Sequence, residues 1–309
     1  MNKNDKVLIL GSRGMVGSAI LRELQKKGFT NILHPLREEL DLLRQSDVEE
    51  YFEKTQPAYV FLAAAKVGGI LANNTYRADF IFENLQIQQN VYSAAFKVKT
   101  PNLLFLGSSC IYPKNAPQPL KEEYLLTSEL EPTNEPYAIA KIAGLKTAES
   151  FRRQYRLHWI SVMPTNLYGE NDNFDLVNSH VIPGLIARID QAIKNGDKEF
   201  NIWGSGKPRR EFLYVDDMAL ACIHLMNQGK DCPDFVNVGV GEDIEIGELA
   251  AMIAQKMGFK GNFVFDTTKP DGTMRKLLDV SKINTLGWMP QMSLSEGLDK
   301  TIQFYRNKL

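Results

Sequence analysis

A short aliphatic run that leads straight into a glycine-rich turn constrains the fold of this chain more than any other feature. Residues 7–10 (VLIL) precede residues 11–17 (GSRGMVG), and a helical pattern of apolar residues follows over 16–27. In such a strand–turn–helix unit the small residues let the backbone approach a pyrophosphate, and the helix start supplies N–H donors and a favourable dipole. The unit predicts a dinucleotide-binding site, the alternative being an ordinary tight turn.

The alternation of strands and helices continues through the first 160 residues. Helical patterns such as 80–97 separate further apolar runs, which predict strands at 31–33, 59–62, 103–106 and 159–162. Strands that are apolar throughout are typical of a parallel sheet covered on both faces. The pattern predicts an α/β fold, with a doubly wound parallel-sheet Rossmann domain.

The alternation breaks after Pro164. Polar, turn-rich sequence follows at 169–178, and the loop after Trp203 contains Gly204, Gly206 and Pro208. The elements expected in this part are helices at 181–194, 246–257 and 294–307 and a strand at 235–238. We expect a smaller α/β substrate-binding lobe assembled from pieces that are not contiguous in the sequence.

Composition excludes several classes of protein. The 309 residues are 44% hydrophobic, enough for a full core, and the 36 basic residues are balanced by 37 acidic ones, so nothing favours nucleic acid as a partner. No apolar run approaches the roughly 18 residues that span a membrane. Three scattered cysteines indicate a reducing compartment, and four histidines without ligand spacing give no metal site. We expect a soluble cytoplasmic protein with no membrane partner.

Two arginines bear on the choice of cofactor. Arg37 follows the second strand near the place where a carboxylate would bind the free 2′-hydroxyl of NAD, and Arg13 lies inside the glycine loop. Two cations that converge on one corner suit a phosphate dianion, which favours NADP(H). Glu38 and Glu39 weigh against this reading, since either could pair with Arg37.

Tyr137 and Lys141 begin a helical pattern that continues to Tyr155. A spacing of four residues places both side chains on one face, and a neighbouring ammonium would depress the pKa of the phenol. Such a tyrosine can exchange a proton with a sugar oxygen while a nicotinamide exchanges hydride with the carbon. Ser108 follows the strand at 103–106, at a sheet edge where this fold presents ligand-contacting groups.

With these residues in view, the chain resembles the extended short-chain dehydrogenase/reductase family. Within that family it is similar to the epimerase-reductases that act on GDP-linked 4-keto-6-deoxy sugars. The segments that carry the resemblance are 11–17, 63–70 (AAAKVGGI), 72–75 (ANNT), 107–113 (GSSCIYP), 131–141 (EPTNEPYAIAK), 164–169 (PTNLYG), 178–183 (NSHVIP), 203–206 (WGSG), 210–213 (REFL) and 269–272 (KPDG). The segment 227–235 looks short for the family.

The resemblance implies NADPH-dependent epimerisation at C3 and C5 and reduction at C4 of a GDP-linked substrate. Ser108, Tyr137 and Lys141 would form the reductase triad. The implied cofactor contacts are Gly11, Ser12, Arg13, Gly14, Met15, Val16, Gly17, Arg37, Leu106, Gly107, Ser108, Ser109, Lys141, Pro164, Thr165, Asn166, Leu167 and His180. The implied substrate contacts are Arg188, Trp203, Arg210 and Asp271. For Arg188, a helix-surface arginine is an equal alternative.

The same resemblance divides the chain into two parts. Residues 1–170, with about 212–240, would form the NADP-binding Rossmann domain. Residues of about 171–211 and 241–309 would form the lobe that binds the nucleotide sugar.

Epimerisation next to a ketone needs a base, an acid and a group that stabilises the enolate oxygen. Cys110 lies two residues after Ser108, and His180 lies at the start of the helical pattern at 181–194. A thiol and an imidazole titrate closer to neutrality than ordinary carboxylates or lysines. Cys110 could instead be a small core residue, and His180 merely a helix-start residue. The resemblance favours Cys110 as base and His180 as acid.

Two other functions and one assembly are consistent with the sequence. Another nucleotide-sugar epimerase or reductase would act on a UDP- or dTDP-sugar, and a catalytically silent dinucleotide sensor would lack part of the triad. The helices at 80–97 and 137–155 carry apolar residues on more than one face, which predicts a homodimer with a four-helix interface. The residues that suggest this are Val91, Ala94, Ala95, Ile142 and Leu145.

Overall fold

A computed structural model describes residues 1–176, 179–268 and 271–308. Its centre is a six-stranded sheet in the order β10-β5-β4-β3-β1-β2, in which all neighbouring strands are parallel. The strands of this sheet are β1 (Val7–Leu10), β2 (Ile32–Leu33), β3 (Tyr59–Leu62), β4 (Asn102–Leu106), β5 (His158–Pro164) and β10 (Phe235–Val238). The predicted parallel sheet is therefore confirmed. The strand β2 lies on one side of β1, and β3 and the later strands lie on the other, so the strand order switches between β1 and β3.

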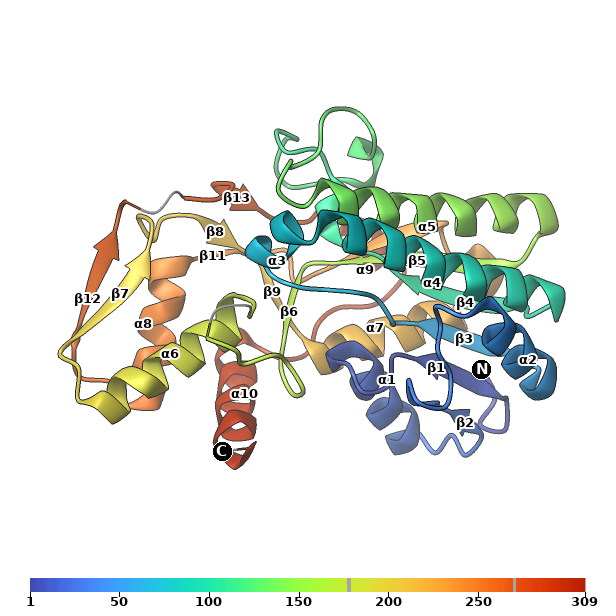
Figure 1. The fold of residues 1–309 in the computed structure, drawn as a ribbon, viewed down its shortest axis with the longest axis horizontal. Coiled ribbons are helices and arrows are strands. Elements are labelled where there is room, and N and C mark those ends of the chain that lie inside the picture. Colours follow the sequence, from blue (N-terminus) through green and yellow to red (C-terminus); the bar gives the residue numbers. More distant parts are fainter. Residues whose placement is uncertain (177–178, 269–270, 309) are drawn as a thin grey trace.

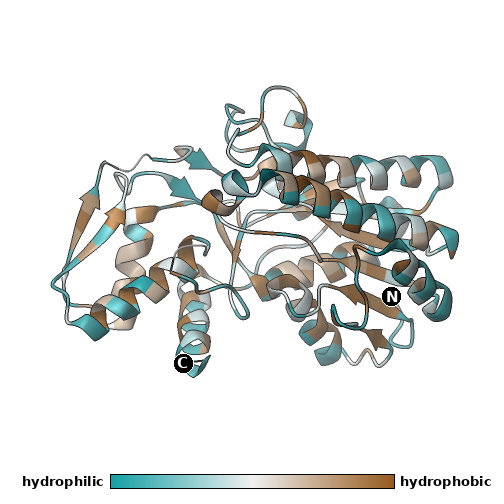
Figure 2. Ribbon diagram, viewed as in Figure 1, coloured by the Kyte–Doolittle hydropathy of each residue, from teal (hydrophilic) through white to brown (hydrophobic). Residues whose placement is uncertain are grey.

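Helices cover both faces of this sheet (Figure 1). Along β1, Val7 and Ile9 pack in one apolar cluster and Leu8 and Leu10 in another, as alternate side chains of a strand must. The first cluster lies under α1 (Met15–Lys26) and α7 (Val215–Asn227); the second lies under α2 (Gln45–Thr55) and α4 (Arg77–Lys97). Helix α5 (Glu135–Tyr155) packs beside α4. Figure 2 shows apolar strands enclosed between helices whose outer faces are largely hydrophilic.

A second lobe stands beside the sheet, at the left of Figure 1. Its core combines α6, α8 and α10 with aromatic residues of neighbouring strands. Its larger elements are α6 (Val181–Asn195), β7 (Glu199–Trp203), α8 (Ile246–Met257), β12 (Asn262–Asp266) and α10 (Leu294–Lys308). Short elements complete the fold: α3 (Ile70–Thr75), β6 (Asn166–Tyr168), β8 (Arg209–Arg210), β9 (Phe212–Tyr214), β11 (Ile244–Glu245), β13 (Arg275–Lys276) and α9 (Ser281–Thr285).

The two parts meet where the chain passes repeatedly between them. At this junction the carboxylate of Glu211 is completely buried. One oxygen accepts hydrogen bonds from the backbone N–H groups of Val240 and Gly241, at 2.6 and 2.8 Å, and the other accepts from Leu278 at 2.9 Å. One side chain thus joins three segments that are far apart in the sequence.

Several elements differ from the sequence-based expectation. The helices α2 and α7 and the strand β7, which ends at Trp203, were not predicted. Ile283 and Trp288 pack in the apolar cluster beneath α1 and α7, so the chain returns to the main sheet near its end. Asn178, Lys269 and Pro270, which belong to two of the resemblance motifs, lie outside the described residues.

Candidate active site

A cavity of about 1900 Å³ lies where the main sheet meets the second lobe. It opens at the carboxyl ends of β1, β3, β4 and β5, which is where a doubly wound sheet binds its ligands. Every candidate site residue expected from the sequence lines this cavity except Lys141, which is buried behind it. Segments spread from residue 10 to residue 276 are thereby brought to one place.

The glycine loop forms a cradle made of backbone alone. Helix α1 begins after Gly14 without a side-chain cap, so its first N–H groups face the cavity unpaired by any side chain. A Cβ on Gly17 would lie 2.1 Å from the carbonyl oxygen of Gly11. Gly11 itself has φ +91°, and its Cβ would lie 2.7 Å from the nitrogen of Ala64. The donor set and the close approach fit a dinucleotide pyrophosphate.

The two arginines expected at the adenosine ribose differ in their surroundings. Arg13 is 3.3 Å from a carboxylate oxygen of Glu38, and both side chains are about two-thirds exposed. Arg37 is exposed, lines the same end of the cavity, and makes no hydrogen bond or ion pair with the described residues. Glu38, which could have paired with Arg37, therefore pairs with Arg13 instead. An exposed ion pair of this kind is weak.

Strand β4 and helix α5 place Ser108, Tyr137 and Lys141 together. Ser108 follows β4 and accepts a hydrogen bond from the backbone N–H of Cys110 at 3.3 Å. Lys141 lies one turn after Tyr137 on α5, with its ammonium 5.6 Å from the centre of the phenol ring. That ammonium donates a hydrogen bond to the carbonyl of Leu106 at 2.7 Å.

The expected depression of the tyrosine pKa is wrong for this arrangement. Burial raises the pKa of Tyr137 far above its ordinary value, the nearby thiol of Cys110 adds to the rise, and only the hydrogen bond with Ser108 opposes it. Burial also lowers the pKa of Lys141 to about 8. Desolvation is the largest influence on the pKa of both groups, and it disfavours the charged form of each.

Cys110 is buried beside the triad. Burial raises the pKa of its thiol, while the ammonium of Lys276, the hydrogen bond with Ser108 and the ammonium of Lys141 lower it. The thiol is therefore not a group that titrates near neutrality by itself, contrary to expectation. Its strongest positive neighbour is Lys276, which the sequence analysis did not select.

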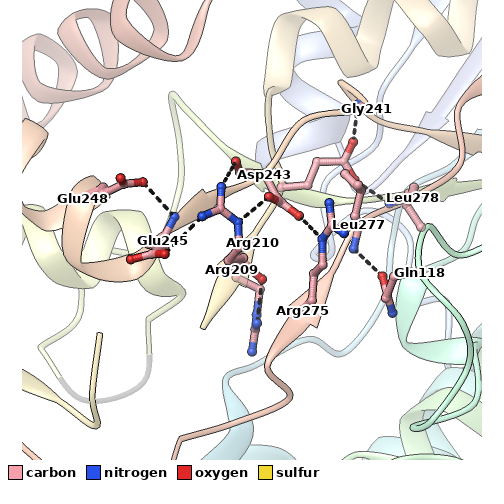
Figure 3. Close-up of polar contacts among 11 residues, drawn as sticks. Gln118, Arg209, Arg210, Gly241, Asp243, Glu245, Glu248, Arg275, Leu277 and Leu278 are labelled. Atoms are coloured by element: carbon pink, nitrogen blue, oxygen red, sulfur yellow. Dashed lines mark hydrogen bonds and ion pairs between the residues drawn. The ribbon is translucent and has the colours of Figure 1, made fainter. Parts of the chain in front are cut away.

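Lys276 reaches the cavity from the small sheet β11-β8-β13. Figure 3 shows Arg209 and Arg275 meeting on Asp243, which they hold on one face of this sheet. Arg210 pairs with Lys276 across β8 and β13, and alternate residues of a strand face opposite sides. Both line the cavity, and neither forms an ion pair within the described part of the chain. The nearby KPDG motif was the one available sequence signal for Lys276.

His180 is the residue immediately before α6 and lines the cavity with its side chain half exposed. Its Nδ1 atom is 3.9 Å from Oδ1 of the buried Asp172. The structure thus brings His180 to the same cavity as Cys110 and Tyr137, although 40 or more residues separate it from each in the sequence.

The far end of the cavity is cationic and aromatic. The guanidinium of Arg188 lies over the rings of Phe200 and Trp203, at 5.0 and 5.1 Å, and donates a hydrogen bond to the carbonyl of Asn201. Arg188 is therefore held against β7 rather than solvated on the helix surface. Trp203 is 59% exposed, which leaves one aromatic surface free for a planar ligand.

Asp271 is held by the loop that follows Trp203. Its two carboxylate oxygens accept hydrogen bonds from the backbone N–H and the hydroxyl of Ser205, at 2.8 and 2.7 Å. These bonds lower the pKa of Asp271. The residue fixes the glycine loop after Trp203, and its oxygens keep lone pairs for further donors.

A parallel sheet with a backbone phosphate cradle and a Ser-Tyr-Lys group at its carboxyl edge defines a dinucleotide-dependent oxidoreductase or epimerase. The chain belongs to the NAD dependent epimerase/dehydratase family, whose profile matches residues 7–239. No group of His, Cys, Asp or Glu in the described residues is arranged to hold a metal ion. None of the helices described there combines the length and apolarity needed to cross a membrane.

Named relatives extend this assignment over the whole chain. GDP-L-fucose synthase 1 of Arabidopsis thaliana is 55% identical over 98% of this chain and 94% of its own length. GDP-L-fucose synthase of Escherichia coli (strain K12) is 52% identical over 97% of this chain and 96% of its own. Among solved structures, the GDP-mannoheptose C4 reductase MlghC from Campylobacter jejuni with NADP bound has a TM-score of 0.91 and 38% identity, covering 99% of both chains.

Proposed function

We propose that this protein converts GDP-4-keto-6-deoxy-D-mannose to GDP-L-fucose, by epimerisation at C3 and C5 and NADPH-dependent reduction at C4. It is an NADP-dependent oxidoreductase with epimerase activity, as relatives at 52–55% identity over nearly the whole chain support. The observation that carries the proposal is one cavity lined by the phosphate cradle, by Ser108 and Tyr137 with Lys141 buried behind them, and by Cys110 and His180.

NADP(H) is the cofactor, and when bound it supplies the hydride for C4. The backbone N–H groups of the loop 11–17 would hold its pyrophosphate, and Arg13 and Arg37 the 2′-phosphate. Pro164 to Leu167 would line the nicotinamide pocket. The remaining proposed contacts are Leu106, Gly107, Ser108, Ser109, Lys141 and His180.

Tyr137 is proposed to give its hydroxyl proton to the C4 oxygen during reduction. Its raised pKa keeps the proton in place until negative charge develops on that oxygen. Ser108 would donate a second hydrogen bond to the same oxygen. Lys141 would orient the tyrosine and the nicotinamide ribose relative to each other, since its own ammonium is fixed by the Leu106 carbonyl.

Cys110 is proposed as the base of the epimerisation and His180 as the acid. Removal of a proton from C3 or C5 leaves an enolate, whose oxygen at C4 would be stabilised by Ser108 and Tyr137. The base must act as thiolate, although burial opposes the ionised form. The ammonium of Lys276 supports the thiolate, because it is the strongest opposite charge acting on Cys110.

Arg188, Trp203, Arg210 and Asp271 are proposed to bind the GDP part of the substrate. The arginines would meet the diphosphate, and burial without a carboxylate partner lowers the pKa of both. The exposed ring of Trp203 would pack on a planar or sugar surface. Asp271 would accept from a hydroxyl or guanine N–H with the lone pairs that Ser205 leaves free.

A homodimer and a cytoplasmic location complete the proposal. The residues that suggested a second apolar face on α4 and α5 (Val91, Ala94, Ala95, Ile142 and Leu145) are all buried inside the subunit. Other apolar residues of the same two helices are exposed instead: Phe82, Phe96, Ile139 and Tyr155. These support a four-helix interface. Three unpaired cysteines support a reducing compartment.

The division of the chain also remains a proposal. Residues 1–170 with about 212–240 would bind the cofactor, and about 171–211 with 241–309 the nucleotide sugar. The membership of β10 in the main sheet and of α6, α8 and α10 in a separate apolar core supports it. The segment that contains Ile283 and Trp288 packs on the cofactor side.

NADPH oxidation measured with GDP-4-keto-6-deoxymannose, and with its UDP counterpart, tests the function directly. We expect rapid oxidation with the GDP sugar and GDP-L-fucose as the product identified by NMR. Preference for the UDP or dTDP sugar would instead identify another nucleotide-sugar enzyme of the family. Binding of NADPH without turnover of any of them would identify a sensor.

A further inference from the structure

Asp172 is a buried carboxylate next to the cavity that the steps above do not use. Its side chain is 4% exposed. One oxygen, Oδ1, accepts the backbone N–H of Asn173 at 2.8 Å. The other, Oδ2, is shielded from solvent and has no hydrogen-bond partner among the described residues. A buried carboxylate with a single hydrogen bond is costly, so a further partner is expected for it.

The imidazole of His180 lies within 4 Å of this carboxylate and can form a cation. The Nδ1 atom of His180 is 3.9 Å from Oδ1 of Asp172, about 1 Å longer than an N–H···O hydrogen bond. The ring of His180 is half exposed and lines the cavity, so its motion toward Asp172 meets little packing. Catalytic hydrogen bonds are often long without substrate and shorten in the complex.

The position of Asp172 is fixed from its other side by the cofactor helix. Glu170 lies 3.7 Å from Arg22 of α1, and the side-chain amide of Asn171 donates to the hydroxyl of Ser18 of α1 at 3.1 Å. The backbone N–H of Asp172 also points to the carbonyl of Gly169, at 3.4 Å. The two residues before Asp172 therefore attach this segment to the helix whose first turn forms the phosphate cradle.

We propose that Asp172 is the positioning residue of His180. In this arrangement Nδ1–H of the ring donates to the carboxylate, which turns Nε2 toward the substrate and fixes the tautomer. The negative charge behind the ring also stabilises the imidazolium, which is the form that gives a proton to the inverted carbon. The inference rests on the proposed acid role of His180, but its geometry is testable without any turnover.

The first test reads the ring directly, in the protein saturated with NADP⁺. We expect ¹⁵N NMR of histidine-labelled protein to show neutral His180 with its proton on Nδ1, the signal being assigned by its loss in His180→Gln. In Asp172→Asn that preference should disappear. An unchanged tautomer in Asp172→Asn would overturn the proposal, whatever substrate the enzyme uses.

The second test is a double-mutant cycle on solvent deuterium incorporation into the GDP-4-keto sugar. Asp172→Asn should slow exchange at least about tenfold, with the KM for the sugar and the Kd for NADPH unchanged. In the His180→Gln background the same change should slow it no further. An equal loss of exchange rate in both backgrounds would show that Asp172 has a structural role, and it would refute the proposed pairing of Asp172 with His180.

Asp175→Asn is the matched control, since it makes the same chemical change at an exposed carboxylate of the same segment. It should leave exchange unchanged in both backgrounds. If the wild-type protein does not turn over this sugar at all, the proposed function fails while the NMR result still decides the role of Asp172.

Discussion

Lys141 and Tyr137 lie one turn apart on α5, with the ammonium 5.6 Å from the centre of the phenol ring and nearly free of water contact. The charge has one hydrogen bond, to the Leu106 carbonyl, and the pKa of Lys141 falls to about 8 because burial disfavours the charged form. Burial of this ammonium therefore lowers the stability of the folded protein.

Replacement of Lys141 by methionine should stabilise the protein at pH 7 while abolishing reduction. The fall in pKa from 10.5 to about 8 corresponds to roughly 3 kcal/mol against folding at neutral pH. Part of this is offset by the lost hydrogen bond, so we expect a gain of about 2 kcal/mol in the free energy of unfolding, measured with urea.

The pH dependence of that gain follows from proton linkage. Between pH 8 and 10.5 the unfolded chain keeps the proton that the folded protein has released, so wild-type stability rises with pH. The advantage of Lys141→Met should therefore shrink across this interval. A constant difference from pH 7 to pH 10 would contradict the assignment.

Arg37→Ala should weaken NADPH binding tens-fold and leave NADH binding nearly unchanged. Arg37 is free of partners among the described residues, so loss of a charge-assisted bond pair costs on the order of 2 kcal/mol. Fluorescence titration with both cofactors measures the ratio. As a control, Glu38→Gln releases Arg13 and should tighten NADPH; equal weakening of both cofactors by Arg37→Ala rules the assignment out.

Cys110→Ala and Tyr137→Phe should separate the two reactions. Without the thiol, solvent deuterium should no longer enter C3 and C5, while NADPH binding persists because Cys110 lies beyond the phosphate cradle. Without the phenol, reduction should fail while some exchange remains. Exchange at the wild-type rate in Cys110→Ala would place the base elsewhere.

Lys276→Met should shift the pH dependence of exchange upward. Burial already raises the pKa of Cys110, and removal of the strongest opposing charge leaves less thiolate at a given pH. We expect exchange at pH 7 to fall at least about tenfold and to recover partly as the pH rises. Lys276→Arg keeps the charge and serves as the control; a uniform loss at every pH would show that Lys276 acts otherwise.

Phe82→Glu should yield a monomer if the outer face of α4 forms the dimer interface. The ring is 66% exposed in the subunit, so the change costs the fold little, whereas a charge inside a four-helix interface is unfavourable. Light scattering at micromolar concentration measures the mass. Lys54→Glu on α2 is a charge-changing control away from these helices; wild-type protein that is already monomeric would refute the dimer.

The parallel sheet was predictable from the sequence because its strands are buried on both faces and read as short apolar runs. Helix α7 was not, because most of its residues are buried and only a narrow stripe with Asp216, His224 and Asn227 is left to indicate the helical period. Helix α2 has only two buried residues, Val48 and Phe52, which is too weak an amphipathic pattern.

The parts of the candidate site formed by residues close together in the sequence were predictable, as in the glycine loop and the Tyr137–Lys141 pair. The balance of electrostatic effects was not, because desolvation depends on packing from distant segments. Lys276 lowers the pKa of Cys110 from 166 positions away in the sequence, because folding brings both residues to one cavity.

The buried carboxylate of Glu211 has a consequence for how this architecture could be divided. Its hydrogen bonds to Val240, Gly241 and Leu278 are supplied by segments on both sides of the junction. If either part were expressed separately, or transplanted onto another Rossmann domain, the carboxylate would lose some of these donors and would no longer join the three segments. The second lobe is thus not an exchangeable module, and recombination between relatives must carry all three segments together.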